Sequence, residues 1–221
     1  MFDRIIKLLS RYGTTFISGL GTTLLLALIS VALGCIIGAL VAIMRNCRVK
    51  FLRAFATTYV EIIRDTPLLL QLYFFYFMLP DIFPQLKLSK FTCIAVALII
   101  NSGAYMAEIF RSGIQSIDRG QAEAARSLGL SSRQTMLRII LPQAFKNILP
   151  ALCNEFVAIT KETSLASTFY VGDLMTQYQV ISGKTYLVLE PLIIIGIIYF
   201  VITFTMSKLI AVLERRLKED D

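Results

Sequence analysis

The chain has 221 residues, 56% of them hydrophobic, with a mean hydropathy of +0.70 and a net charge of +7. This apolar share exceeds that of soluble domains, so we expect much of the surface to face lipid. The basic residues gather between apolar stretches and form no aromatic-interleaved patch, which argues against nucleic-acid binding. The four cysteines lie far apart without CxxC spacing and histidine is absent, so the sequence predicts neither a disulfide nor a metal site.

Apolar runs long enough to cross a membrane recur along the chain. Residues 1–13 mix basic and apolar side chains and predict an amphipathic segment in the membrane interface. A spanning helix needs about 20 mostly apolar residues, and five runs qualify. They cover approximately residues 14–44, 54–79, 91–112, 146–168 and 188–212. We therefore predict an all-α membrane protein with five transmembrane helices, and a single domain over residues 1–221 because no linker or repeat interrupts it.

Basic residues follow the first, third and fifth predicted spans. They are Arg45, Arg48, Lys50 and Arg53, then Arg111, Arg119, Arg126, Arg133, Arg138 and Lys146, and finally Arg215, Arg216 and Lys218. Because positive charge concentrates in cytoplasmic loops, we expect these two loops and the C-terminus in the cytoplasm. The N-terminus and the connections at residues 80–90 and 170–186 are then expected outside.

The first two spans each contain a feature that affects helix packing. Gly34 and Gly38 in the first span permit close helix contact, either within the chain or between protomers. In the second span Arg64 and Asp65 precede Pro67, which frees a backbone carbonyl and predicts a kink. The two charges at this kink are interpreted either as a local ion pair or as part of a gate.

Polar residues also occur near the middle of the third and fourth spans. Asn101, Ser102 and Glu155 lie where polar groups without partners are costly, so they predict a binding site at the membrane midplane. The alternative is a hydrogen bond that joins the two spans. Lys161 and Glu162, near the outer end of the fourth span, either form a gate or extend toward the interface.

The connection between the third and fourth spans, residues 118–142, has its own helical signals. Asp118 is a candidate N-cap, residues 121–128 are rich in helix formers, and Gly129 offers the left-handed position that ends a helix. Ser131-x-x-Gln134 has the form of a capping box that opens a second helix, which we expect to stop near Pro142. The sequence thus predicts two short helices hinged at Gly129, and an interfacial helix pair is one interpretation of them.

This connection resembles the EAA loop of binding-protein-dependent ABC importers, which presents its first helix to a groove on the ATPase subunit. The resemblance rests on the run from Glu123 to Ala125, on Gly129 four residues later, and on the Leu-Pro pair at 141–142. It implies that the ATPase-coupling residues are Glu123, Ala124, Ala125, Arg126 and Gly129.

Other stretches resemble the polar amino-acid branch of the same permeases. They are residues 59–72, 101–108, 149–156 and 161–165. This branch usually has Gly at the position of Asp65 and often Asp at that of Glu162. The resemblance implies a type I ABC importer permease fold with cytoplasmic coupling helices, in a bacterial inner membrane.

The resemblance also implies an assembly. Two permease protomers, identical or homologous, would face each other above two ATPase subunits, and an extracytoplasmic amino-acid-binding protein would deliver the substrate. The chain has no GxxxxGK[ST] sequence, so ATP and Mg would be bound by the ATPase, and this chain would be a translocation subunit without cofactor or catalytic residues.

Within such an importer, the midplane residues would bind an amino acid. Asn101 and Ser102 would hold its ammonium and carboxylate, and Glu155 would pair with a cationic side chain, as in arginine, lysine or histidine. Glutamine, glutamate and cystine are alternative substrates. An ion-coupled secondary transporter is a further alternative, although five spans lack the usual doubled halves. A membrane enzyme has no support, since the sequence contains no HExxH motif and no histidine.

Overall fold

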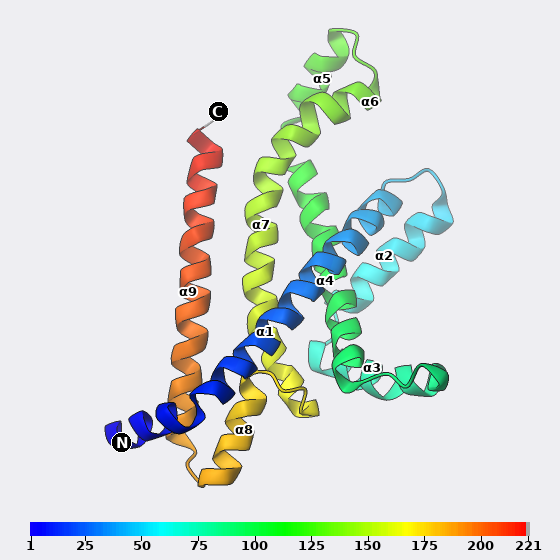
Figure 1. Ribbon diagram of the computed structural model, residues 1–221. Coiled ribbons are helices and arrows are strands. Elements are labelled where there is room, and N and C mark those ends of the chain that lie inside the picture. The colour runs from blue at the N-terminus through cyan, green and yellow to red at the C-terminus, as the bar shows by residue number, and fades with distance from the viewer. Residues whose placement is uncertain (220–221) are drawn as a thin grey trace.

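The structure, a computed structural model, describes residues 1–219 and is built almost entirely of helices (Figure 1). The long helices are α1 (Phe2–Arg45), α4 (Lys90–Gln115), α7 (Leu141–Glu162) and α9 (Leu189–Glu219). The shorter helices are α2 (Lys50–Arg64), α3 (Leu68–Ile82), α5 (Arg119–Ser127), α6 (Ser132–Thr135) and α8 (Leu174–Thr185). The described residues contain no strand, and the predicted all-α architecture is confirmed.

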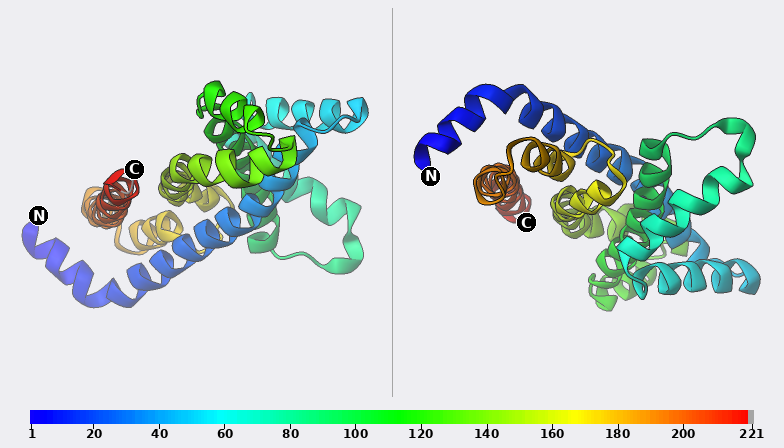
Figure 2. Two further views of the ribbon diagram at one scale, coloured as in Figure 1. Left: turned by 90° about the horizontal axis from the view of Figure 1, so that it is seen from above. Right: turned by 90° about the horizontal axis from the view of Figure 1, so that it is seen from below.

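Helix α1 is the element that joins the two parts of the core. One buried cluster brings Leu26 of α1 together with α3, α4 and the 3-10 turn Thr163–Phe169. A second cluster packs Leu8 and Phe16 of α1 against α8 and α9. The predicted interfacial segment at residues 1–13 is therefore continuous with the first span, and Figure 2 shows α1 curving around α8 and α9.

Helix α1 crosses α4 where two glycines remove side chains from the contact. A Cβ atom on Gly34 would lie 2.8 Å from Ser102 Oγ, and one on Gly38 would collide with Met106. Because both close approaches are to α4 of the same chain, the glycine pair serves packing within the protomer. Of the two alternatives drawn from the sequence, the structure shows the close helix contact within the chain.

The predicted spans correspond to helices of different character. Among the described residues, α1, α4 and α9 are long and apolar enough to cross a membrane, and α2 with α3 makes a fourth if the bent pair counts as one span. The fourth predicted span, residues 146–168, is α7 followed by the 3-10 turn. Its hydropathy is lower because Lys146, Asn147, Asn154 and Glu155 interrupt the apolar residues.

The second predicted span is broken rather than kinked. The axes of α2 and α3 differ by 109°, so residues 54–79 do not form one continuous helix. Pro67 has no N–H to donate to the carbonyl of Ile63, and its ring prevents the helix from continuing. In Figure 1, α3 lies across the end of the bundle that also holds α8.

The connection predicted at residues 170–186 contains helix α8. Asp173 caps this helix by accepting the N–H of Met175 at 2.9 Å, and the N–H of Leu174 donates to Thr23 Oγ1 of α1 at 3.0 Å. Burial raises the pKa of the Asp173 carboxyl, although hydrogen bonds from Thr176 and the backbone oppose this effect. A helix anchored to α1 thus replaces the simple connection that we expected.

The three groups of basic residues that follow the first, third and fifth predicted spans belong to elements at one end of the molecule. Figure 1 shows the α1–α2 turn, the α5–α6 pair and the C-terminal end of α9 toward the top, while the N-terminus and α8 lie toward the bottom. The two termini are at opposite ends, as an odd number of alternating spans requires.

Candidate functional sites

The first candidate site is the connection between α4 and α7, where the EAA resemblance lies. Asp118 is the N-cap of helix α5, and its carboxylate accepts the N–H of Gly120 at 2.7 Å. Gly129, in the turn that follows the helix, has φ of +84°. Only glycine adopts such a backbone readily, so the predicted left-handed turn at Gly129 is confirmed. The hydrogen bond to Asp118 confirms the predicted N-cap.

The turn at Gly129 closes the last carbonyls of α5. The N–H of Gly129 donates to the Arg126 carbonyl at 3.0 Å, and that of Leu130 to the Ala125 carbonyl at 3.1 Å. These two bonds are the Schellman pattern, which fixes the direction in which the chain leaves the helix. The turn is therefore a defined corner rather than a loose hinge.

The second helix of the connection begins with the predicted capping box. The N–H of Ser131 donates to Gln134 Oε1 at 2.9 Å, and the N–H of Gln134 donates to Ser131 Oγ at 3.3 Å. The prediction that this helix stops near Pro142 is wrong. A π-helical turn at Met136–Ile140 widens the helix just before the proline, and α7 continues directly from it.

Most of the predicted coupling residues face outward. Glu123, Ala124, Arg126 and Gly129 are exposed, whereas Ala125 is buried. The neighbouring Leu128 is 82% exposed, an unusual state for a large apolar side chain beside a helix end. Helix α5 therefore presents small, charged and apolar groups together, and contact of these residues with an ATPase stays a prediction.

The second candidate site is the break between α2 and α3, where Gln71 replaces the missing backbone donor. Its side-chain Nε2 donates to the carbonyl of Ile63 at 2.7 Å, the acceptor that Pro67 leaves free. Its Oε1 accepts from Asn101 Nδ2 of α4 at 2.9 Å. The predicted interhelical hydrogen bond of Asn101 thus exists, but it reaches α3 rather than the fourth span.

Two of the three predicted substrate residues are buried in this region. Asn101 and Ser102 are 2% and 0% exposed. Asn101 Oδ1 and Ser102 Oγ have no hydrogen-bond partner within the described residues. Since buried polar atoms are normally paired, these two oxygens are candidates for contact with a group from outside the protomer.

A carboxylate on α4 binds arginines from three helices. Glu108 contacts Arg45 of α1 at 2.8 Å, Arg64 of α2 at 3.7 Å and, more closely, Arg111 of α4. Arg64 is thus paired with Glu108 instead of with its neighbour Asp65, which corrects the local ion pair considered from the sequence. The cluster holds the C-terminal end of α2 against α1 and α4.

Four of the predicted charged residues act electrostatically on Tyr105, a residue that the sequence does not single out. Tyr105, on α4, lies in the electrostatic field of Glu162, Arg64, Glu155 and Asp65. The guanidinium of Arg64 is 5.7 Å from the centroid of the Tyr105 ring. One turn after Asn101, Tyr105 follows the i, i+4 spacing of a shared helix face, the signal that could have identified it.

This charged face has an excess of negative groups. The charges that act on Tyr105 are three carboxylates and one guanidinium, and Glu155 and Glu162 lie two turns apart on α7. Lys161 is exposed and interacts with Glu162, so it is the second cation of the region. The arrangement suits a cationic ligand that also has a group for Arg64.

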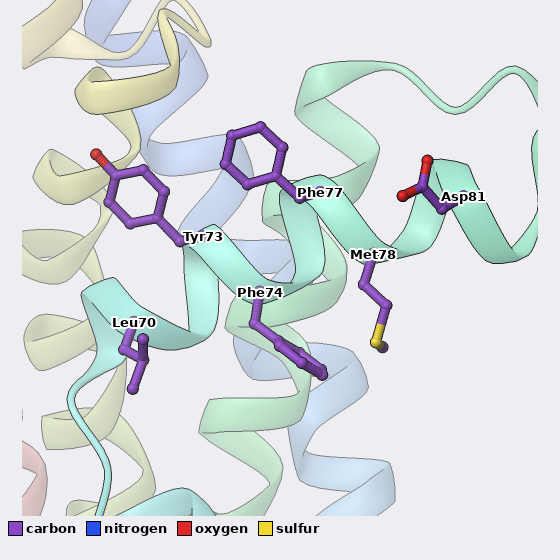
Figure 3. A pocket seen from close by; sticks show the side chains of 6 residues that line it. All are labelled: Leu70, Tyr73, Phe74, Phe77, Met78 and Asp81. Carbon is purple, nitrogen blue, oxygen red and sulfur yellow. The ribbon is translucent and has the colours of Figure 1, made fainter.

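The hollows of the surface lie elsewhere. A depression of about 460 Å³ runs along one face of α3. Figure 3 shows three of the side chains that line it, Tyr73, Phe74 and Phe77, projecting from this helix. A second, apolar hollow of about 360 Å³ lies between α1, α7 and α9. None of the predicted site residues lines either hollow. Within residues 1–219 no three His, Cys, Asp or Glu side chains are arranged to hold a metal ion.

Comparison with known proteins identifies the family of the chain. Residues 31–219 match the family described as the binding-protein-dependent transport system inner membrane component. The chain belongs to this family. The resemblance drawn from the EAA loop is therefore confirmed, and the chain is a multi-pass inner-membrane permease.

Relatives of this permease have names from amino-acid transport. An arginine transport system permease protein of Bacillus subtilis is 39% identical over 208 residues, which cover 93% of each chain. A probable glutamine ABC transporter permease protein of the same species is 41% identical over 204 residues, covering 92% of this chain and 94% of the relative.

Solved structures confirm the type I importer fold. The crystal structure of an amino acid ABC transporter with histidines superposes with a TM-score of 0.88 at 45% sequence identity, covering 94% of this chain and 96% of that chain. An inward-facing structure of the MetNI methionine ABC transporter gives a TM-score of 0.70 at 18% identity, with 92% and 98% covered. The second likeness concerns the fold alone.

Proposed function

We propose that this permease is the translocation subunit of an ATP-driven importer for a cationic amino acid. The observation that carries the proposal is the charged face beside Tyr105, where Glu155, Glu162 and Asp65 outnumber Arg64 and Lys161. An amino acid with a cationic side chain offers two positive groups and one carboxylate, which complements this balance. The arginine-transport name of one relative and the histidine-containing neighbour structure support the same substrate class.

Glutamine is the second candidate substrate. Its support is the glutamine permease name of a relative with 41% identity. The charged face gives it a weaker rationale, because a neutral side chain would leave at least one half-buried carboxylate without a counter-charge.

The side chain of the substrate would bind to Glu155, and its α-ammonium and carboxylate groups would bind to Asn101 and Ser102. Asn101 Oδ1 and Ser102 Oγ are buried and unpartnered among the described residues, so a substrate ammonium would satisfy them. Access requires that α3 and α1 move relative to α4, because both side chains are covered in this conformation. Arg64, Asp65, Pro67, Lys161 and Glu162 would form the gate.

Transport would be powered by a separate subunit. Helix α5, with Glu123, Ala124, Ala125, Arg126 and Gly129, would seat in the ATPase, which binds ATP and Mg. The assembly would contain two permease protomers, two ATPases and an extracytoplasmic binding protein. The end with α5 and the C-terminus would be cytoplasmic and the N-terminus outside, because the basic groups lie at the α5 end.

The test is uptake by the complete importer reconstituted in vesicles. The permease, its ATPase and the binding protein are purified together, and uptake of labelled arginine, lysine, histidine, glutamine and cystine is measured with and without ATP. We expect ATP-dependent uptake of the cationic amino acids. Uptake that persists without ATP would contradict the assignment to an ATP-driven importer. A preference for glutamine would contradict the cationic substrate class and favour the second candidate.

A further inference from the structure

The turn between α1 and α2 contains cations that the fold does not use. Arg45, Arg48, Lys50 and Arg53 fall within nine residues that contain no acidic side chain. Arg45 is bound to Glu108, whereas Arg48, Lys50 and Arg53 are exposed. Among the ion pairs found in residues 1–219, none includes these three. The turn therefore presents three positive charges outward.

Large apolar side chains are exposed beside these cations. Phe51 and Phe55, one turn apart on α2, are 77% and 62% exposed, and Val49 is 55% exposed. The opposite face of α2 is covered, since Ala56 and Val60 are buried against α1 and α4. The outward face of α2 thus combines positive charge with an aromatic surface.

We infer that this surface binds an anionic phospholipid. The phosphate of the headgroup would be held by Arg48, Lys50 and Arg53, while Phe51 and Phe55 would lie against the acyl chains. A phospholipid has both chemistries in one molecule, whereas a soluble anion would leave the aromatic face uncovered. The turn lies at an end of the helical bundle, where lipid headgroups are found.

The number of cations on this surface predicts how much their removal should weaken the binding of anionic lipid. A basic residue at a membrane surface strengthens attraction to anionic lipid by about fivefold. Removing all three cations should therefore weaken binding by about a hundredfold. Neutral lipid should bind the original and the altered protein equally.

The test compares lipid retention in the intact importer. The complex is extracted with its ATPase, exchanged into mixed phosphatidylglycerol and phosphatidylcholine, and the bound lipids are counted by native mass spectrometry. We expect retained phosphatidylglycerol in the original protein and its loss in the variant R48Q/K50Q/R53Q. The single variants R48Q and R53Q, each weakened about fivefold, provide the test if the triple variant does not assemble.

The matched control removes three exposed lysines at the other end of the molecule, in the variant K87Q/K90Q/K184Q. It should keep the bound phosphatidylglycerol. Equal loss in both triple variants would overturn the inference, because it would indicate attraction to net charge alone. Loss of the ATPase from R48Q/K50Q/R53Q with unchanged lipid would also overturn it, since the surface would then belong to the ATPase.

Discussion

Glu108 is the residue on which three helices of the core converge. Its carboxylate holds Arg45, Arg64 and Arg111, and both Glu108 and Arg45 are largely shielded, with side chains 20% and 18% exposed. A shielded charge that loses its partner is costly, because the remaining charge must stay in a poorly solvated place. One carboxylate therefore stabilises an arrangement in which the positive charges would otherwise repel each other.

Replacing Glu108 by Gln should destabilise the permease. We expect a loss of about 2–3 kcal/mol, below the range for fully buried pairs because water reaches part of the cluster. Thermal unfolding of the detergent-solubilised protein measures the change. Glu61→Gln, on the exposed side of α2, is the control and should change stability by less than about 0.5 kcal/mol. Equal stability of the two variants would mean that the arginines need no counter-charge.

Gln71 is the residue that makes the break between α2 and α3 possible. Replacing it by Leu leaves the Ile63 carbonyl and Asn101 without their partners, which should cost about 1–3 kcal/mol of stability. Gln85→Leu, in the exposed turn after α3, removes an amide that is not needed at the break and should cost much less. Unfolding temperatures compare the two. If Gln71→Leu unfolds like the original, another group must satisfy the carbonyl.

At the scale of elements, the sequence predicts the caps and the tight turn correctly, but neither the continuation of the helix through Pro142 nor contacts between distant helices. The cap at Asp118, the turn at Gly129 and the capping box at Ser131 depend on side chains within four residues, so the sequence predicts them. Pro67 predicts an interruption of the second span, but the 109° angle also brings α3 against α4, where Gln71 bonds Asn101 at 30 positions' separation. Tyr105 was missed for the same reason, because its charged neighbours come from other helices.

Helix α5 owes its orientation to the corner at Gly129. Proline there would fix φ near −65°, far from the observed +84°, and would remove the N–H that bonds the Arg126 carbonyl. Gly129→Pro should abolish copurification of the ATPase while leaving membrane insertion intact. Gly196→Ala, where an added methyl meets open space, is the control. Normal ATPase binding by Gly129→Pro would refute the coupling role of this corner.

At the scale of the whole molecule, one continuous helical rod joins the corner beside α5 to Glu155 and Glu162. Helix α6, the π turn and α7 run without interruption from Ser132 to Glu162. At 1.5 Å per residue this rod is about 45 Å long. A displacement of α5 by an ATPase would be carried along it to Glu155 and Glu162, because packed helices move as rigid bodies. Pro142 is tolerated in the rod since the π turn precedes it.

Selectivity is the property of the whole permease on which the proposed role of Glu155 makes its most direct prediction. If Glu155 pairs with a cationic side chain, Glu155→Gln should reduce uptake of arginine or lysine by at least tenfold, the equivalent of about 1.4 kcal/mol, and affect neutral amino acids much less. Uptake with the same binding protein and ATPase measures the ratio. Glu61→Gln, outside the charged face, should leave the ratio unchanged. Equal losses for charged and neutral substrates would mean that Glu155 holds helices rather than selects, because a structural defect slows the transport of every substrate alike.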